Sequence, residues 1–283
     1  MPLPSDDLNL FPPRNPDGSY PIDPESHRFL KVWQGPQHPG ITGNMSLELM
    51  VQGDEVMSGK THVGYLHRGF EKLMERRRYI QCFPIVCRIC VPEPDFNEFC
   101  FATAVEELSG IQIPETARWL RTLVLEMART SSYLMWLGGQ AAALGMGLPG
   151  QWTNYLRDYM LDRFEELTGG RIYHMYILPG GVRGLLPDGF ARRMEETLSQ
   201  IETVMDDIER MMFHNAVFRK RTEGVGVIDP AMIDTYGITG PNAQAAGIPR
   251  DVRRDNPYLV YPQLAFEPQT ARESDIFARA DVR

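Results

Sequence analysis

The sequence predicts a mainly α-helical protein, a helical bundle with a small antiparallel β portion at its N-terminus. Two patterns support this fold class. Over residues 64–218 apolar residues recur at the three- to four-residue spacing of amphipathic helices, whereas over residues 28–63 they tend to alternate with polar ones. With 283 residues, 43% of them hydrophobic, the chain is long enough to bury a sizeable core.

The β portion is predicted from two runs and a turn. Alternation is loose from Arg28 to Trp33 and clear from Met45 to Val51. The turn-forming residues 52–55 then let the chain return as a second strand from Val56. Before these strands, residues 1–27 are rich in Pro, Asp and Ser, and we expect an extended N-terminal arm.

The helical core is predicted over residues 64–218, beginning directly after Gly64. Asp95 is placed to cap one helix, and Pro114 suits the first turn of the next. Two long core stripes follow at helical spacing: Leu120, Leu123, Met127, Ser131 and Leu134, then Phe190, Met194, Leu198, Ile201, Met205, Ile208 and Met212. Over residues 219–283 the pattern fades, and a loop-rich segment is expected.

Composition narrows the class of protein. The net charge of -8 argues against nucleic-acid binding, which needs a basic surface for the phosphates. No apolar run reaches the ~20 residues of a membrane-spanning helix, and the N-terminus does not resemble a signal peptide. Four cysteines crowd into residues 82–100, which favours a reducing compartment over a disulfide scaffold. We therefore expect a cytoplasmic protein that contacts a membrane only through a partner.

Four short motifs could carry chemistry, and each has a structural interpretation beside the functional one. His38 lies between prolines in GPQHPG, and Arg68 lies at a helix start in GYLHRGFEK. Cys87 and Cys90 form a CxxC that could bind a metal or remain as buried thiols. A glycine-rich loop, LPGGVRG, follows His174 and lacks the phosphate-binding pattern, so a connecting loop is the simpler interpretation.

Together the motifs resemble those of a known family. GPQHPG, GYLHRGFEKL, YIQCFPIVCR, AVEEL, TGGRIYHMYILPGGVR and DVRRDNPYLVY occur in the order found in the 49-kDa, or D-type, subunit of complex I. The D-type subunit of F420H2 dehydrogenases and the large subunit of [NiFe] hydrogenases are related. The resemblance runs from about Gln34 to Arg283 and implies that the family domain is incomplete at the C-terminus of these 283 residues.

The resemblance implies partners and an acceptor site. Family members pack against a subunit that holds the last 4Fe-4S cluster, beside a C-type subunit and above a membrane arm, and the quinone pocket forms between subunits. Arg68 and His174 would lie near the partner's cluster, although the family's histidine matches Tyr173 rather than His174. The acceptor pocket would be formed by His38, Thr42, Val91 and Ala143, with Pro92 beside them.

The quinone residues of complex I are replaced in this chain. Thr42 stands where those members have a histidine, Val91 where they have the quinone-binding tyrosine, and Ala143 where they have an aspartate. The hydrogenase pattern is also incomplete, because Glu93 replaces a metal-binding cysteine of RICGIC. No metal ligand is therefore assigned, and Cys87 and Cys90 remain candidates.

Three functional hypotheses follow. The first is a subunit of a membrane-associated oxidoreductase (translocase) of the NAD(P)H- or F420H2-quinone type, with quinone as substrate and with no cofactor held by this chain alone. It would lie peripherally on the cytoplasmic face of the membrane, held by the complex, and would have no activity by itself. The second is a non-catalytic assembly subunit of such a complex. The third is a hydrogenase-like protein without a complete NiFe site.

Overall fold

The structure is a computed structural model that describes residues 30–38, 43–53 and 55–283. The chain divides into two compact units, Met1–Phe70 and Glu71–Arg283. The arm predicted over residues 1–27 lies outside the described residues.

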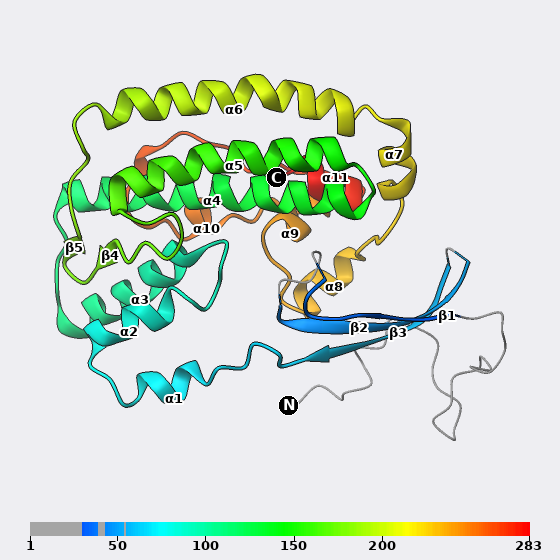
Figure 1. Ribbon diagram of the computed structural model, residues 1–283. Helices are drawn as coiled ribbons and strands as arrows, with labels where there is room; N and C mark the ends of the chain where they lie inside the picture. The colour runs from blue at the N-terminus through cyan, green and yellow to red at the C-terminus, as the bar shows by residue number, and fades with distance from the viewer. Residues whose placement is uncertain (1–29, 39–42, 54) are drawn as a thin grey trace. The chain divides into compact units, whose positions relative to one another are not determined.

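The first unit contains a three-stranded antiparallel sheet in the order β1-β2-β3 (Figure 1). Its strands are β1 (Leu30–Gln34), β2 (Met45–Gln52) and β3 (Glu55–Val63). Val51 pairs with Val56 across the predicted turn, with a register shift between Met50 and Val51. The antiparallel β portion at the N-terminus is thereby confirmed.

The helix predicted directly after Gly64 starts later than expected. Helix α1 spans only Phe70–Met74, and residues 64–69 are not helical. Gly64 and Gly69 have φ angles of 101° and 65°, outside the right-handed helical region. Leu66 on the predicted apolar stripe is 43% exposed, so its spacing did not reflect a buried face.

The second unit is built from helices. The long ones are α3 (Pro94–Ser109), α4 (Glu115–Ala143), α5 (Gly147–Thr168) and α6 (Phe190–Met212). The shorter elements are α2 (Tyr79–Val86), β4 (Ile177–Leu178), β5 (Gly181–Val182), α7 (Ala216–Thr222), α8 (Pro230–Thr235), α9 (Pro241–Ala245), α10 (Val252–Asp255), the 3-10 helix η1 (Tyr261–Gln263) and α11 (Ile276–Asp281). Helix α5 packs against both α4 and α6, and the three lie side by side in Figure 1.

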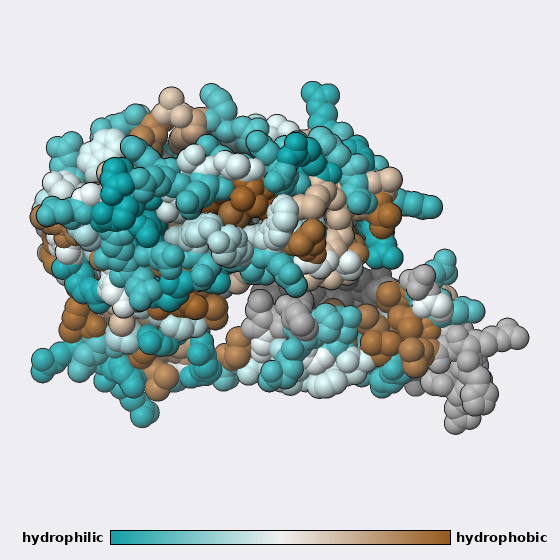
Figure 2. All heavy atoms as spheres, turned by 45° about the horizontal axis from the view of Figure 1, so that its top comes forward, coloured by the Kyte–Doolittle hydropathy of each residue, from teal (hydrophilic) through white to brown (hydrophobic). Residues whose placement is uncertain are grey.

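The two predicted stripes form much of the core. On α4, Leu120, Met127 and Leu134 are buried, and on α6 the buried stripe runs from Phe190 to Met212. In this stripe Met205 is partly buried and Leu198 is 40% exposed. The mainly α-helical fold class is thus confirmed. Hydrophilic side chains cover most of the surface of the helical unit that Figure 2 shows, with scattered apolar ones between them.

The helices of the described residues are too short or too polar to cross a membrane.

Candidate functional site

Helix α3 presents three buried carboxylates to the segment 171–183, which follows α5 and contains the β4–β5 hairpin. Asp95 and Glu98 are 0% exposed and Glu106 is 7% exposed. Their spacing puts them on one helix face. Because a buried carboxylate is costly without partners, each must be matched by a group that the facing segment or α4 supplies.

Asp95 is matched by His174. Its two carboxylate oxygens lie 3.0 and 2.9 Å from the His174 Nδ1. The other ring nitrogen, Nε2, lies 3.2 Å from the carbonyl oxygen of Arg171, and the Phe164 ring stacks on the imidazole at 3.9 Å. The expectation that Asp95 caps α3 is therefore wrong: Glu93 is the N-cap residue, and Asp95 lies inside the helix, where it holds the imidazole.

Glu98 is matched by backbone N–H groups of the same segment. Met175 donates to one of its oxygens at 2.7 Å, and Tyr176 and Ile177 donate to the other at 3.0 and 3.3 Å. Burial, and then the nearby charge of Asp95, raise the pKa of Glu98 to about 7, although the three hydrogen bonds favour its ionised form. The segment is thus held by a carboxylate that titrates near neutral pH.

Glu106 is matched by Arg121 of α4 in a buried, two-pronged ion pair with distances of 3.0 and 2.6 Å. Arg121 also donates to the carbonyl oxygens of Leu178, at 2.8 Å, and Gly181, at 2.9 Å. Gly180 N–H donates to Glu106 at 2.8 Å. The glycine-rich stretch predicted to be a simple connecting loop is therefore a hairpin fixed by a buried ion pair.

The same segment contains two left-handed residues that are not glycine. Tyr173 has a φ of 61° and Met175 a φ of 46°, and each such residue costs of order 1–3 kcal/mol. The bond to His174, which lies between these two positions, and the bond to the Met175 N–H hold the segment in this conformation. The Tyr173 ring lies 4.8 Å from the Arg88 guanidinium carbon, so the constrained backbone places a half-buried phenol beside a cation.

Val91 and His174, two residues that the sequence assigns to the acceptor pocket and the cluster side, border one small cavity. Its volume of about 10 Å³ is close to the space that one water molecule needs. Pro92 and Arg157 also line it, and the Arg157 Nε is buried without a hydrogen-bond partner in the described part of the chain. Ala143 is exposed at the C-terminal end of α4 and does not line this cavity.

Burial affects both thiols of the CxxC motif. Cys87 is fully buried, and burial raises the pKa of its thiol to about 11. Burial also raises the pKa of Cys90. A cysteine binds a metal as its thiolate, and the described residues contain no group of three or more His, Cys, Asp or Glu side chains able to hold a metal ion.

The remaining predicted site residues belong to the first unit. His38 is exposed, and its backbone N–H donates to the Gly35 carbonyl oxygen at 3.0 Å. Arg68 is exposed, and its guanidinium carbon lies 4.6 Å from the Phe70 ring. Thr42 lies outside the described residues. The roles of these residues at an acceptor or a cluster stay predictions.

Sequence reasoning missed Glu98 and Arg121 and misassigned Asp95. A signal existed for Arg121, because the residues at helical spacing from it, Ala117, Val124 and Ala128, are all apolar. The AVEEL motif contained Glu106 without indicating its partner. A charged residue at a core position of a helix requires a buried partner, but the sequence alone does not name it.

Comparisons with known proteins agree with the resemblance carried by the motifs. Residues 144–283 match the family model described as the 49 Kd subunit of respiratory-chain NADH dehydrogenase. The D-type subunit of NADH-quinone oxidoreductase from Thermosipho melanesiensis is 43% identical over 254 residues, which are 90% of this chain and 69% of that protein. The D-type subunit of F(420)H(2) dehydrogenase from Methanosarcina mazei is 37% identical over 92% of this chain and 69% of its own length.

The fold is also found in a solved complex. A chain in the structure of the membrane-bound sulfane sulfur reductase, an archaeal respiratory membrane complex, superimposes with a TM-score of 0.85 at 42% identity. The match covers 92% of this chain and 70% of that one. The chain therefore belongs to the family of the 49-kDa subunit of respiratory-chain NADH dehydrogenase, which includes the D-type subunits of NADH-quinone oxidoreductase.

Proposed function

We propose that this chain is a subunit of a membrane-associated oxidoreductase complex of the NAD(P)H- or F420H2-quinone type. Its role would be to form the acceptor pocket beside the terminal iron–sulfur cluster of a partner subunit. The observation that carries this proposal is the family match, which extends over nine-tenths of the chain in two relatives that are D-type subunits of oxidoreductases. The chain would lie on the cytoplasmic face of the membrane, held by the partner and by a C-type subunit.

The arrangement in the second unit supports an acceptor site at this place. Val91 and His174 are 83 positions apart in the sequence, yet they line the same cavity. At about 10 Å³ this cavity has room for one water molecule, so an acceptor would contact the exposed side of Val91 rather than enter the cavity. Beside it the strained segment presents Tyr173 next to Arg88. Strain of this kind persists where the surrounding structure over-determines it, which is typical of functional sites. Electrons would tunnel from the partner's cluster to the acceptor, and this chain would supply shape and electrostatic field.

The residues at the pocket suggest that proton delivery differs from that of complex I. Val91 is aliphatic and 41% exposed, so it can pack against an acceptor but cannot donate a proton to it. Tyr173, directly before His174 in the sequence, brings a phenol close to this region, and we propose that it takes part in hydrogen bonding to the acceptor. Arg68 would stabilise the reduced cluster of the partner through its positive charge.

A second candidate acceptor is a sulfane sulfur compound. One observation favours it: the solved complex that contains a chain 42% identical to this one is a sulfane sulfur reductase. A pocket without the quinone-binding tyrosine and histidine would fit an acceptor that does not need two hydrogen bonds to a quinone headgroup. The assembly role and the hydrogenase-like role remain as further hypotheses.

The test uses the complex assembled with its cluster-bearing partner. Reduction of a short-chain ubiquinone and of a polysulfide would be measured separately, with NADH, NADPH and reduced F420 as donors. We expect quinone reduction, and we expect Val91→Tyr combined with Thr42→His to increase it. Ile89→Tyr, which adds the same side chain to an exposed position of the same segment, is the control and should leave the rate unchanged.

Each outcome decides between the hypotheses. Polysulfide reduction without quinone reduction would replace the proposed acceptor by the second candidate. Reduction of neither, in a complex whose cluster is reduced by the donor, would leave the assembly role. About one nickel per chain by elemental analysis would instead support the hydrogenase-like role.

A further inference from the structure

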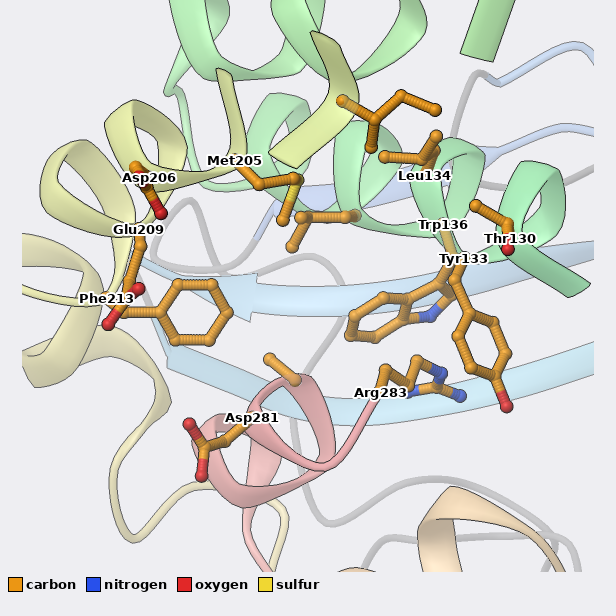
Figure 3. A pocket seen from close by; sticks show the side chains of 13 residues that line it. Thr130, Tyr133, Leu134, Trp136, Met205, Asp206, Glu209, Phe213, Asp281 and Arg283 are labelled. Atoms are coloured by element: carbon orange, nitrogen blue, oxygen red, sulfur yellow. The ribbon is translucent and has the colours of Figure 1, made fainter. Parts of the chain in front are cut away.

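A buried acid–base pair, Asp95 and His174, borders the water-sized cavity of the candidate site. Asp95 is 0% exposed and His174 4% exposed, and both residues line that cavity. The larger cavity of about 510 Å³ between α4, α6 and α11 differs in this respect, because the carboxylates of its lining, Asp206, Glu209 and Asp281, are exposed (Figure 3). Of these two cavities, the small one joins a buried proton-exchanging pair to a space for water.

The contacts of the His174 ring indicate how many protons the pair holds. Nδ1 faces the two Asp95 oxygens at 3.0 and 2.9 Å, and Nε2 faces the carbonyl oxygen of Arg171 at 3.2 Å. A carbonyl oxygen can only accept a hydrogen bond, so Nε2 must carry a proton. A second proton must lie between Nδ1 and the carboxylate, because lone pairs would otherwise face each other. The pair therefore holds one proton more than an ionised aspartate beside a neutral histidine.

Burial of the pair requires the same proton. An ionised aspartate beside a neutral histidine would carry a net negative charge, and a buried charge without a counter-charge is costly. Glu98, one turn further along α3, is a second buried acid close to Asp95. The Phe164 ring stacks on His174 at 3.9 Å and keeps solvent from that face of the imidazole. The shared proton makes the pair neutral, whether it is bound to the nitrogen or to the carboxylate.

Titratable and charged groups face the pair from the elements that border the cavity. Glu98 lies on α3, and its pKa of about 7 lets it titrate at neutral pH. The Cys87 thiol, after α2, lies near both carboxylates, and burial raises its pKa to about 11. The bordering residues of α4 are uncharged, and the remaining charged or titratable groups are Arg157, Arg171 and Tyr173. A test of the pair must therefore keep Glu98 unchanged.

The cavity offers a water molecule the partners that it needs. A buried water makes about three hydrogen bonds, and the volume of about 10 Å³ suits one molecule. The Arg157 Nε–H is buried without a hydrogen-bond partner in the described part of the chain, and it can donate to this water. The Ser131 hydroxyl and Asp95 also border the cavity. Val91, 41% exposed, borders it as well, so the water would connect the pair to the side that the acceptor contacts.

We propose that the Asp95–His174 pair is the proton donor of the acceptor site and acts through a water molecule in this cavity. The inference rests on the proposed function, since it needs an acceptor at the exposed side of Val91. The positions at which complex I has its quinone-site histidine and aspartate are Thr42 and Ala143 in this chain, so the donor would lie elsewhere in the fold.

The proton transfer balances in two steps. When electrons from the partner's cluster reduce the acceptor, the shared proton of the pair passes to the water, and the water passes one of its own protons to the acceptor. The bond between the proton and the pair breaks, and a new bond to a proton forms on the reduced acceptor. A proton from solvent then restores the pair. Asp95 and His174 store and position the proton without touching the acceptor.

The first test uses the 283-residue chain, labelled with ¹⁵N at its histidines. Nuclear magnetic resonance distinguishes a ring nitrogen that carries a proton from a bare one, and the signals of His174 are those lost in His174→Gln. We expect Nε2 to carry a proton at neutral pH and Nδ1 to be hydrogen-bonded through a second one. A bare nitrogen on either side of the ring would overturn the proposal, because the pair would then lack the stored proton.

The second test uses the complex assembled with its cluster-bearing partner. Asp95→Asn with His174→Gln keeps polar side chains at both positions but removes the proton that can dissociate. It should lower kcat for acceptor reduction about a hundredfold, the size of a lost general acid, while the donor still reduces the cluster. Glu209→Gln with His214→Gln makes the same chemical change at an exposed pair 3.8 Å apart and should leave kcat unchanged.

A second variant tests the water and leaves the pair in place. Ser131→Thr adds one methyl group to the lining of the cavity and keeps the hydroxyl, and it should also lower kcat. Ser132→Thr, at the next position of α4, does not line the cavity and is its control. In both rate-lowering variants the solvent deuterium isotope effect on kcat should increase, because proton delivery then limits the rate. A pair with a purely structural role would not change this isotope effect.

The outcomes separate this inference from the proposed function. A kcat of the double variant within about twofold of the wild type would overturn the donor role and leave the proposed function intact. If the double variant does not assemble, unchanged kcat and isotope effect in Ser131→Thr would overturn the donor role in the same way. Reduction of no acceptor by the wild-type complex would overturn both, and the state of the His174 nitrogens would still show whether the pair holds its proton.

Discussion

Replacing Glu98 by Gln should change how the stability of the helical unit depends on pH. Glu98 is fully buried, and its pKa is raised to about 7 from an ordinary value of 4.5. Between these two pH values the folded protein binds a proton on Glu98 that the unfolded chain has already lost. Protonated Glu98 therefore contributes stability that is complete below about pH 4.5 and is lost as the pH rises through 7.

The expected size follows from the two pKa values. At 1.36 kcal/mol per pKa unit, a pKa raised from 4.5 to about 7 corresponds to roughly 3 kcal/mol. Gln cannot ionise, so the variant lacks this dependence. The free energy of unfolding of the wild type, minus that of Glu98→Gln, should thus fall by roughly 3 kcal/mol between pH 4.5 and pH 8.

Urea unfolding at several pH values, followed by circular dichroism of the helices, measures this difference. Gln cannot accept all three backbone hydrogen bonds, so the variant has an offset in stability, and the slope against pH is the informative quantity. Glu107→Gln, an exposed carboxylate on the same helix, is the control and should give a flat difference. Asp95→Asn should reduce the slope, because the charge of Asp95 helps to raise the pKa of Glu98.

A difference that stays constant within about 0.5 kcal/mol over this range would refute the reasoning. It would mean that Glu98 is ionised in the folded protein throughout, and that its three backbone donors outweigh the effect of burial on its pKa. The slope of the unfolding free energy against urea concentration should be the same in all variants, which shows that each exposes the same surface on unfolding.

Three further predictions concern other residues. Arg121→Met should lower the free energy of unfolding by roughly 3–5 kcal/mol in urea titrations, because it leaves Glu106 buried without a partner, and adding Glu106→Leu should recover much of the loss; equal stability of both variants would contradict this. In the native protein, iodoacetamide should modify exposed Cys100 and leave Cys87 unmodified until urea is added, since the Cys87 thiol is buried with a pKa near 11; mass spectrometry of peptides reports the order. In the assembled complex, Arg68→Ala should lower the reduction potential of the partner's cluster, measured by electron paramagnetic resonance during a redox titration, and an unchanged or raised potential would count against placing Arg68 there.

The helices of the core could be predicted because their sequence signal is local and repeated. On α6 apolar residues return at helical spacing for 23 residues, so one exposed member, Leu198, does not obscure the buried face. The hairpin in the β portion could be predicted for the same reason, since its two strands are adjacent in the sequence and a turn joins them. The start of α1 could not be predicted from the spacing of apolar residues, because two glycines with positive φ interrupt a spacing that otherwise looks helical.

The candidate site could be predicted only in part, since its contacts join residues far apart in the sequence. His174 and Asp95 are separated by 79 positions, and Arg121 and Gly181 by 60. Asp95 near a helix start has the residue type of an N-cap, yet its buried partner decides its conformation. Local preference gives way where a buried charge must be satisfied, because the cost of leaving it unpaired exceeds that of a lost cap.

This long-range pairing bears on how the acceptor site would work. Val91 precedes Asp95 by four residues, and Asp95 holds His174. The stretch proposed to border the acceptor and the segment proposed to lie toward the partner's cluster are therefore attached to the same turn of α3. Glu98, one turn further along, bonds the backbone directly after His174 and has a pKa near 7. A change in the charge of Glu98 would act on the bonds that hold both sides of the proposed site, so its protonation would be coupled to the geometry of that site through one helix.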